Sequence, residues 1–303
     1  MTADPITPYA VFNIEPAWVL ETEAMGSKRK FWYRADSGSE WLFKFPQPNT
    51  GQHWAEKIVA EIAAVLDILH AKVELAVFQG ERGSATESFA RDGRELFHGN
   101  QLMAGQVLGY DSGKRFGQAE HTLDNILLTL DRSFATEEGA LRAKQWMASY
   151  LLLDALVGNT DRHHENWGIL RERTEAGWLG VMAPTFDHAS SLGRELVDDS
   201  RGKCRRRLLA EDRVGEYAER ASGAIFWRNT DRKGLSPLDL VRRAAALHPA
   251  LFAPGLKMLE KVEIESLQQI VLRVPAPWMS DSAREFAVAL MRYTLAQLRS
   301  IGT

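Results

Sequence analysis

The chain has 303 residues, of which 45% are hydrophobic and 25% charged, and its formal net charge at pH 7 is −3. These values are typical of a globular protein of one large or two smaller units, and they make direct nucleic-acid binding by the chain as a whole unlikely in electrostatic terms. Its single cysteine, Cys204, excludes an internal disulfide. Residues 1–8 lack the segments of a signal peptide, and no apolar run approaches the ~18 residues of a membrane span. We therefore expect a cytoplasmic protein, and leave export as an effector open.

The first 100 residues are predicted to form a small antiparallel sheet with one helix. Segments rich in aromatic and β-branched residues, separated by turn residues, predict strands at 18–23, 30–34, 41–45, 73–78 and 87–90. Apolar residues at helical spacing predict a helix over residues 53–69. This unit is expected to span residues 1–100.

The turn between the first two predicted strands contains Gly26, Ser27 and Lys28. A glycine permits close backbone approach, so the exposed amide groups of this loop could bind phosphate oxygens. A plain hairpin turn would have the same sequence. The chain contains neither G-x-G-x-x-G nor G-x-x-x-x-G-K, so the phosphate-binding interpretation rests on the position of the loop before Lys44.

Lys44 is the candidate lysine for the α- and β-phosphates of a nucleotide. It shares one strand face with Leu42, because successive side chains of a strand point to opposite faces. The role requires a glutamate partner on the following helix. Glu61 is the preferred partner because it lies in an apolar run, and Glu56 is the alternative. The two cannot face the same way, since five residues turn a helix by ~500°.

Residues 96–103 are expected to form the crossing to a second unit, where backbone groups would meet an adenine ring. Phe97 and His98 lie in this segment. His98 could transfer protons, although a histidine in a linker more often serves in a turn or a hydrogen bond.

The remaining residues, 101–303, are predicted to be mainly helical. Apolar periodicity predicts helices at 119–132 and 136–156, with Thr136 as an N-cap. Ser236 followed by Pro237 marks another helix start. Residues 282–298 carry one apolar stripe and are predicted to form the last helix.

The segment 158–168 carries the residues for phosphoryl transfer. An apolar helix delivers it, and short strands are predicted at 167–170 and 177–182. In kinase chemistry, one carboxylate accepts the hydroxyl proton while an asparagine and a second carboxylate hold magnesium. We assign these roles to Asp161, Asn166 and Asp187 respectively. The alternative is a polar turn in which Asp161 and Asn166 are local caps.

Arg162 could stabilise phosphate charge, or it could pair with a structural carboxylate. The neighbours His163, His164 and Glu165 could suggest zinc, but a third or fourth ligand at suitable spacing is missing from the sequence. The basic run 201–207 could bind an acidic substrate, RNA or an anionic lipid, or could simply be solvated.

Asp161-Arg162-His163-x-x-Asn166 followed by Phe186-Asp187 resembles the catalytic and metal-binding motifs of HipA-like serine/threonine kinases. The resemblance extends from about Met25 to the C-terminus. It implies a two-lobed α+β protein-kinase-like fold, ATP with Mg²⁺, and phosphorylation of a protein serine or threonine. It also implies that Ser27 is a candidate autophosphorylation site and that an antitoxin-type protein is a candidate partner. HipA-type toxins carry an additional N-terminal subdomain, whereas the strands predicted here begin almost at once.

Two alternatives to a protein kinase stay open. The Asp-Arg-His-x-x-Asn motif is shared with phosphoinositide kinases, so a lipid or small-molecule kinase is the first alternative. The second is a regulator that binds a nucleotide without catalysis.

Overall fold

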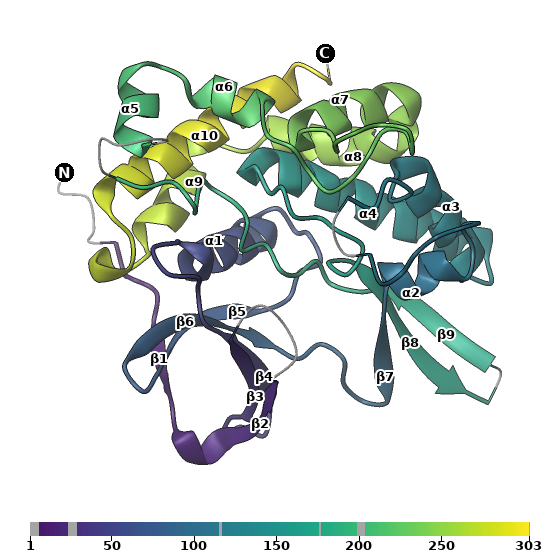
Figure 1. Ribbon diagram of the computed structural model, residues 1–303, viewed down its shortest axis with the longest axis horizontal. Coiled ribbons are helices and arrows are strands. Elements are labelled where there is room, and N and C mark those ends of the chain that lie inside the picture. The colour runs from purple at the N-terminus through teal and green to yellow at the C-terminus, as the bar shows by residue number, and fades with distance from the viewer. Residues whose placement is uncertain (1–5, 24–28, 115–116, 176, 199–203, 303) are drawn as a thin grey trace.

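The computed structural model describes residues 6–23, 29–114, 117–175, 177–198 and 204–302. They form a sheet-containing lobe and a mainly helical lobe, as the sequence predicts (Figure 1). The candidate phosphate loop, with Gly26, Ser27 and Lys28, lies outside the described residues.

The first lobe is built on a six-stranded sheet with the order β1-β5-β6-β4-β3-β2. Its strands are β1 (Val11–Ile14), β2 (Val19–Glu23), β3 (Lys30–Arg34), β4 (Glu40–Lys44), β5 (Val73–Phe78) and β6 (Glu81–Glu87). The pairing of β1 with β5 is parallel, so the sheet is mixed and not purely antiparallel. The strand predicted at 87–90 is wrong, because β6 ends at Glu87.

Alternation along β3 and β4 separates a core face from a cleft face. Phe31 and Phe43 lie in the core of the lobe, with ring centroids 5.2 Å apart. The neighbouring Leu42 and Lys44 point the other way and line a cavity. The aromatic residues of these strands therefore hold Lys44 at a fixed position over the cleft.

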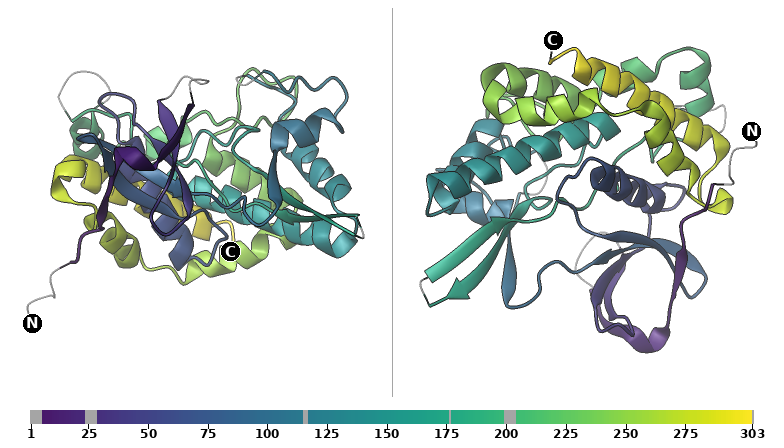
Figure 2. Two further views of the ribbon diagram at one scale, coloured as in Figure 1. Left: turned by 90° about the horizontal axis from the view of Figure 1, so that it is seen from below. Right: turned by 180° about the vertical axis from the view of Figure 1, so that it is seen from behind.

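Helix α1 (Gln52–Val65) lies between the sheet and the helical lobe (Figures 1 and 2). It packs against β5 and β6 on one side and α9 (Ile264–Leu272) on the other. Tyr9, just before β1, also binds this second lobe. Its backbone N–H donates to Arg273 O at 2.7 Å and its hydroxyl to Ile270 O at 3.1 Å. The start of the first lobe, at Tyr9, and its helix α1 are thus both fixed to the C-terminal helices.

A second, three-stranded sheet follows, with the order β7-β8-β9. Its strands are β7 (Arg94–His98), β8 (Gly168–Thr174) and β9 (Gly177–Met182). The pairing moves β7, which precedes residue 100, out of the first lobe's sheet. The short helix α2 (Gly99–Ala104) begins immediately after β7.

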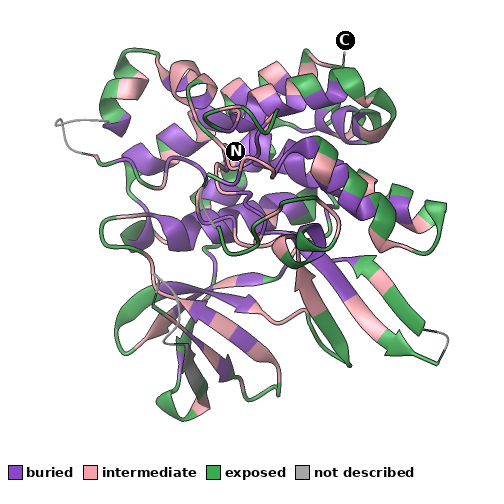
Figure 3. Ribbon diagram, turned by 45° about the vertical axis from the view of Figure 1, so that its right-hand side comes forward, coloured by how far each residue is buried: buried purple, intermediate pink, exposed green. Residues whose placement is uncertain are grey.

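The second lobe contains α3 (Leu123–Ser133), α4 (Glu137–Val157), α5 (Arg205–Ala210), α6 (Val214–Glu219), α7 (Pro237–Leu247), α8 (Pro249–Glu260) and α10 (Asp281–Arg299). The predicted N-caps are confirmed: Thr136 accepts from Gly139 N, and Ser236 accepts from Asp239 N. Helix α4 lies at the centre and packs against α3, α7, α8 and α10. Buried positions gather on these inward helix faces (Figure 3).

Helix α4 ends in the loop that carries the candidate catalytic residues. Its C-cap is Gly158, with φ of 67° in the left-handed region that glycine adopts without strain. Gly158 also contacts the helix α10 side chain Leu290, which lies 3.2 Å from the position a Cβ would take. This glycine thus ends the helix and turns the chain into the cleft.

No helix in the described part of the chain is long and apolar enough to cross a membrane.

Candidate active site

The cleft beside the first sheet contains a cavity of about 670 Å³, a volume typical of small-molecule sites. Its polar lining includes Lys44, Asn166 and Asp187. These residues come from β4 and from the segments before and after the β8–β9 hairpin. The fold therefore brings together three of the predicted site residues. Apolar side chains cover another part of the wall: Leu42, Phe89, Leu96 and Phe186.

Lys44 joins two carboxylates across this cleft. Its Nζ lies 3.0 Å from Glu56 Oε1 and 3.3 Å from Asp187 Oδ1. Glu56 is 1% exposed and also accepts a hydrogen bond of 3.0 Å from the Ser84 hydroxyl. Burial alone would lower the pKa of Lys44, but the charges of Asp187 and Glu56 outweigh it. The pKa of Lys44 is consequently raised, and the amine stays protonated.

The prediction that Glu61 is the partner of Lys44 is wrong. Glu61 faces away from the cleft and binds Lys57 Nζ at 2.7 Å, one turn earlier on α1. Lys57 is itself 3% exposed and binds Glu74 at 2.7 Å as well. The apolar neighbours of Glu61 therefore reflect a second buried charge cluster on the opposite face of α1, and the alternative, Glu56, is the partner.

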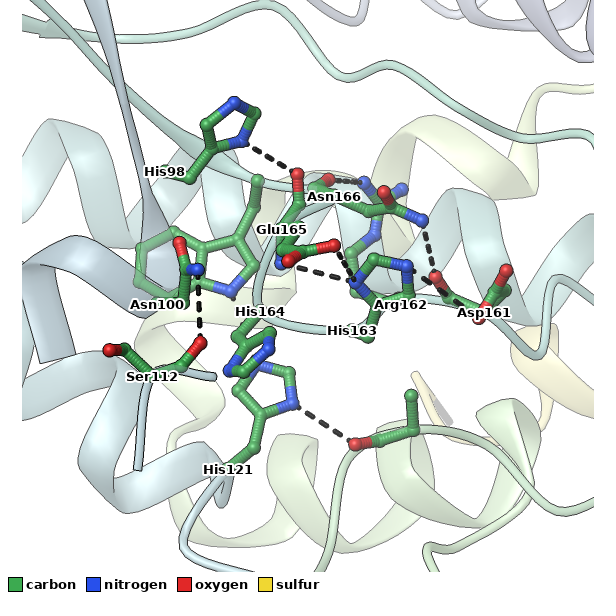
Figure 4. A network of polar contacts seen from close by, with 12 residues as sticks. His98, Asn100, Ser112, His121, Asp161, Arg162, His163, His164, Glu165 and Asn166 are labelled. Carbon is green, nitrogen blue, oxygen red and sulfur yellow. Dashed lines mark hydrogen bonds and ion pairs between the residues drawn. The ribbon is translucent and has the colours of Figure 1, made fainter. Parts of the chain in front are cut away.

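Asp161 and Asn166 are fixed to each other within the loop after α4. The Asn166 Nδ2 donates to the Asp161 backbone oxygen at 2.7 Å (Figure 4). This bond engages the amide nitrogen, so Oδ1 is the atom of this side chain that could serve as a metal ligand. The Asp161 carboxylate is 31% exposed and lines a second cavity of about 540 Å³ on the other side of the loop. Asp161 and Asn166 therefore face two different cavities.

Arg162 pairs with a buried carboxylate, which is the second of the two roles predicted for it. Its side chain is 3% exposed and forms a bidentate pair with Asp154 of α4, at 2.7 and 2.8 Å. The same guanidinium donates to Asn166 O at 2.6 Å and to the Thr185 hydroxyl at 2.9 Å. With these donors directed to buried protein atoms, Arg162 fixes the shape of the loop.

Asp187 has a backbone φ of 56°, which is uncommon for a residue other than glycine. Strained backbone of this kind occurs preferentially at functional sites. The adjacent His188 is buried and accepts from the Thr185 hydroxyl at 2.8 Å. Burial and the neighbouring Arg162 charge hold the pKa of His188 well below its usual value, so it is neutral. Neutral His188 and the Thr185 hydroxyl thus join Asp187 to the loop that contains Arg162.

His98 lines the nucleotide-sized cavity, whereas the Phe97 side chain does not. His98 Nδ1 contacts Glu165 O at 2.8 Å (Figure 4). The Phe97 ring points to the other face of β7, where it packs edge-on against Trp178 with centroids 6.3 Å apart. The Phe97 side chain therefore faces away from the cavity, because neighbouring residues of a strand face opposite ways. The expected contact of the backbone in this segment with an adenine ring stays a prediction.

The structure bears on the zinc interpretation and on the basic run 201–207 only within the described residues. No group of three or more His, Cys, Asp or Glu residues in the described ranges is arranged to hold a metal ion, so His163, His164 and Glu165 form no zinc site there. Residues 201–203 of the basic run 201–207 lie outside the described residues. In its described part, Arg205 is buried and pairs with Asp198 at 2.7 Å, and Arg207 pairs with Glu211 at 2.8 Å. Cys204, at its described end, is buried beside α5.

Sequence reasoning missed several residues that position the site. Asn159 Nδ2 donates to Asp154 Oδ1 at 2.8 Å, and Asn159 Oδ1 accepts from Asp161 N at 3.2 Å. Asp154 gave a signal that could have been read: it is the acidic residue within the apolar run 150–157, eight positions before an arginine. Such a buried carboxylate requires a cationic partner.

The HipA-like C-terminal domain family matches residues 22–233. The chain belongs to this HipA-like family. That match covers the strands and loops that carry Lys44, Asp161, Asn166 and Asp187.

Two relatives show the extent of the likeness. The serine/threonine-protein kinase CtkA of Helicobacter pylori is 25% identical over 271 residues, which is 87% of this chain and 77% of the relative. The crystal structure of CtkA superposes with a TM-score of 0.76 at 20% identity, over 97% of this chain and 99% of CtkA. The fold of this HipA-like chain is thus that of a two-lobed kinase.

The HipA protein of Shewanella oneidensis, solved with HipB and operator DNA, has a TM-score of 0.58 and 16% identity. The comparison covers 95% of this chain and 66% of that one. This HipA-like chain therefore matches about two thirds of the Shewanella protein.

Proposed function

We propose that this HipA-like chain is an ATP- and Mg²⁺-dependent kinase that phosphorylates serine or threonine in proteins. The observation that carries the proposal is the ion-paired series Glu56, Lys44 and Asp187 in a cavity that Asn166 also lines. In protein kinases, a lysine paired with a helix glutamate and a metal-binding aspartate are both needed in place. Here these groups are already in contact.

The residues present fit a nucleotide with magnesium. Asp187 and the Asn166 Oδ1 offer hard oxygen ligands, and magnesium completes its shell with water and phosphate oxygens. Lys44 would bind the α- and β-phosphates. The adenine ring would lie against the apolar wall near Leu96 and His98. When bound, the metal would neutralise charge on the phosphates.

Asp161 is the residue that would act on the acceptor. The acceptor oxygen forms a bond to the γ-phosphorus while the bond from that phosphorus to the β–γ bridging oxygen breaks, and ADP leaves. The acceptor proton passes to the Asp161 carboxylate. This role is supported by the position of Asp161 in the second cavity while Asn166 and Asp187 line the first, so that nucleotide and acceptor would occupy different cavities.

A protein acceptor is favoured by the similarity to CtkA, which is named as a serine/threonine-protein kinase. A lipid or small-molecule kinase is the second candidate, and a nucleotide-binding regulator is the third. Autophosphorylation at Ser27 and a cytoplasmic location remain part of the proposal. An antitoxin-type partner is a secondary proposal, supported by the presence of HipB in the Shewanella complex.

The direct test is transfer from γ-labelled ATP with Mg²⁺, using the wild type and Asp187→Ala, with a cell lysate as acceptor. Label on serine or threonine that disappears in the variant is expected, and mass mapping would locate it. Labelled phosphoinositide without labelled protein would favour a lipid kinase. Mg²⁺-dependent ATP binding without transfer to any acceptor would favour a regulator.

A further inference from the structure

The cavity that Asp161 lines is distinct from the nucleotide cavity and carries a concentration of positive charge. Its charged lining consists of one carboxylate, that of Asp161, and three cations, Arg194, Arg232 and Lys233. His121 also lines it, but burial lowers the pKa of His121 to about 3, so it adds no charge at neutral pH. We will call Arg194, Arg232 and Lys233 the acceptor-side cations.

Among the described residues, the acceptor-side cations have no carboxylate partner in a salt bridge. By contrast, the three arginines of the neighbouring cavity, Arg207, Arg213 and Arg220, are each paired with a glutamate. The charge beside Asp161 is therefore available to a ligand.

Arg194 is the cation nearest the catalytic carboxylate. Its Nη2 donates to the Ser190 hydroxyl at 3.2 Å, and that hydroxyl contacts Asp161 Oδ2 at 3.5 Å. Its backbone is fixed by Gly51 N, which donates to Arg194 O at 2.8 Å at the start of α1. The Arg194 Nε is buried and has no hydrogen-bond partner among the described residues, which is a cost unless a ligand supplies one.

Arg232 and Lys233 are exposed but lie on an ordered loop. Backbone hydrogen bonds close this loop: Gly223 N donates to Leu235 O at 2.7 Å, and Leu235 N donates to Ile225 O at 3.0 Å. A further bond of 3.0 Å from Phe226 N to His121 O joins the loop to the wall of the cavity. The backbone that carries both cations is thus fixed beside the cavity.

We propose that this cavity binds an acidic segment of the protein substrate, with carboxylate or phosphate groups next to the serine or threonine that is phosphorylated. The proposal rests on the proposed kinase function. Anionic groups would pair with the acceptor-side cations while the hydroxyl faces Asp161. The chemistry does not favour RNA, since Phe226 is the only Phe, Tyr or Trp in the described lining, where base stacking would need a series of them.

The first test measures preference among matched peptides. Each has one central serine flanked by Asp, Gln, Lys or phosphoserine, and phosphate transfer is measured as kcat/KM. We expect the Asp peptide to exceed the Gln peptide by about three- to tenfold, as two or three exposed ion pairs would give. A still higher value for phosphoserine would identify a phosphorylated segment as the preferred source of the anion. Equal rates for all flanks, or a preference for Lys, would overturn the proposal.

The variant R232E/K233E should lose the preference for Asp and favour the Lys peptide. The matched control is K257E/K261E, which makes the same charge change at two exposed lysines outside the cavity. The control should keep the preference of the wild type. If R232E/K233E also kept it, the acceptor-side cations would not be the cause.

A binding measurement separates this proposal from the kinase proposal. Fluorescent peptides in which alanine replaces the serine are titrated with each protein, and their anisotropy gives Kd without any transfer. The acidic peptide should bind wild type at least fivefold more tightly than R232E/K233E, with an affinity that falls as salt rises. Such binding without phosphate transfer would support the acidic-segment site and refute the kinase activity. Tighter binding of a single-stranded RNA or of phosphoinositide vesicles than of the acidic peptide would overturn the site as proposed.

Discussion

Glu56 is the residue whose replacement tests the active-site geometry most sharply. Glu56→Gln keeps the shape of the side chain and its contact with the Ser84 hydroxyl but removes the charge that faces Lys44. Lys44 then retains only Asp187, at 3.3 Å. We expect the lysine to move toward Asp187 and to compete with the metal for that carboxylate, so that the phosphates lose their alignment.

The size of the effect follows from the burial of the pair. Glu56 is 1% exposed and the Lys44 side chain 18% exposed, so water replaces the lost charge poorly. Breaking one partner of a buried ion pair costs about 3–5 kcal/mol, and each ~1.4 kcal/mol of transition-state stabilisation is tenfold in rate. Because Asp187 still pairs with Lys44, we expect a loss at the lower end, of about 10²-fold in kcat/KM.

Glu61→Gln is the matched control, five residues along the same helix. Glu61 binds Lys57, which keeps Glu74 as a partner, so kcat/KM should change by less than about twofold. The assay is transfer from γ-labelled ATP, with thermal unfolding measured in parallel to show that both variants are folded. A large loss of activity in Glu61→Gln with little loss in Glu56→Gln would refute the assignment of Glu56.

The other predictions concern the metal, the buried Arg162 and the buried His121. Asn166→Ala should raise the Mg²⁺ concentration for half-maximal transfer by about tenfold, because one oxygen ligand is lost. An unchanged Mg²⁺ requirement would contradict that role. Arg162→Lys should lower the free energy of unfolding by about 3 kcal/mol, since it breaks a buried bidentate pair; lost activity with unchanged stability in denaturant would instead show a phosphate contact. His121 has a pKa of about 3 in the folded protein against 6.5 unfolded. Its stabilising contribution is therefore complete above pH 6.5 and falls below it by about 1.4 kcal/mol per pH unit. His121→Asn should reduce this slope of unfolding free energy between pH 6 and 4, and an unchanged slope would show that His121 is protonated without cost.

The candidate catalytic residues could be predicted from the sequence because they lie at short, characteristic spacings along the chain. Asp161 and Asn166 lie five positions apart in one loop, and Asp187 follows a hairpin whose strands were recognisable from their flanks. Lys44 was predictable from strand alternation, which the burial of Phe43 confirms. In each case the local sequence alone constrains which side chains can meet, so tertiary packing had little left to decide.

The errors arose where a choice depended on which face of an element meets a partner far along the chain. The sequence allows either Glu56 or Glu61 of α1 as the partner of Lys44. The choice depends on the positions of Ser84 and Glu74 on the neighbouring strands. The apolar surroundings of Glu61 correctly indicated a partly buried ion pair, but its partner is Lys57 and not Lys44. Likewise the three acceptor-side cations come from segments up to 39 positions apart, between Arg194 and Lys233, and no sequence spacing joins them.

The buried Arg162 fixes the positions of two loops relative to each other. One loop carries the proposed base, Asp161, and the other the proposed metal ligand, Asp187. Arg162 binds Asp154 at the end of α4, the backbone of Asn166, and Thr185 just before Asp187. One cation thus connects the loop that carries Asp161 with the loop that carries Asp187. An uncompensated charge at this depth is costly, so the arrangement persists only while all of its partners are in place. In the Asp161-Arg162 pair, the arginine thus fixes the loops of Asp161 and Asp187 relative to each other, and the aspartate would face the acceptor that we propose.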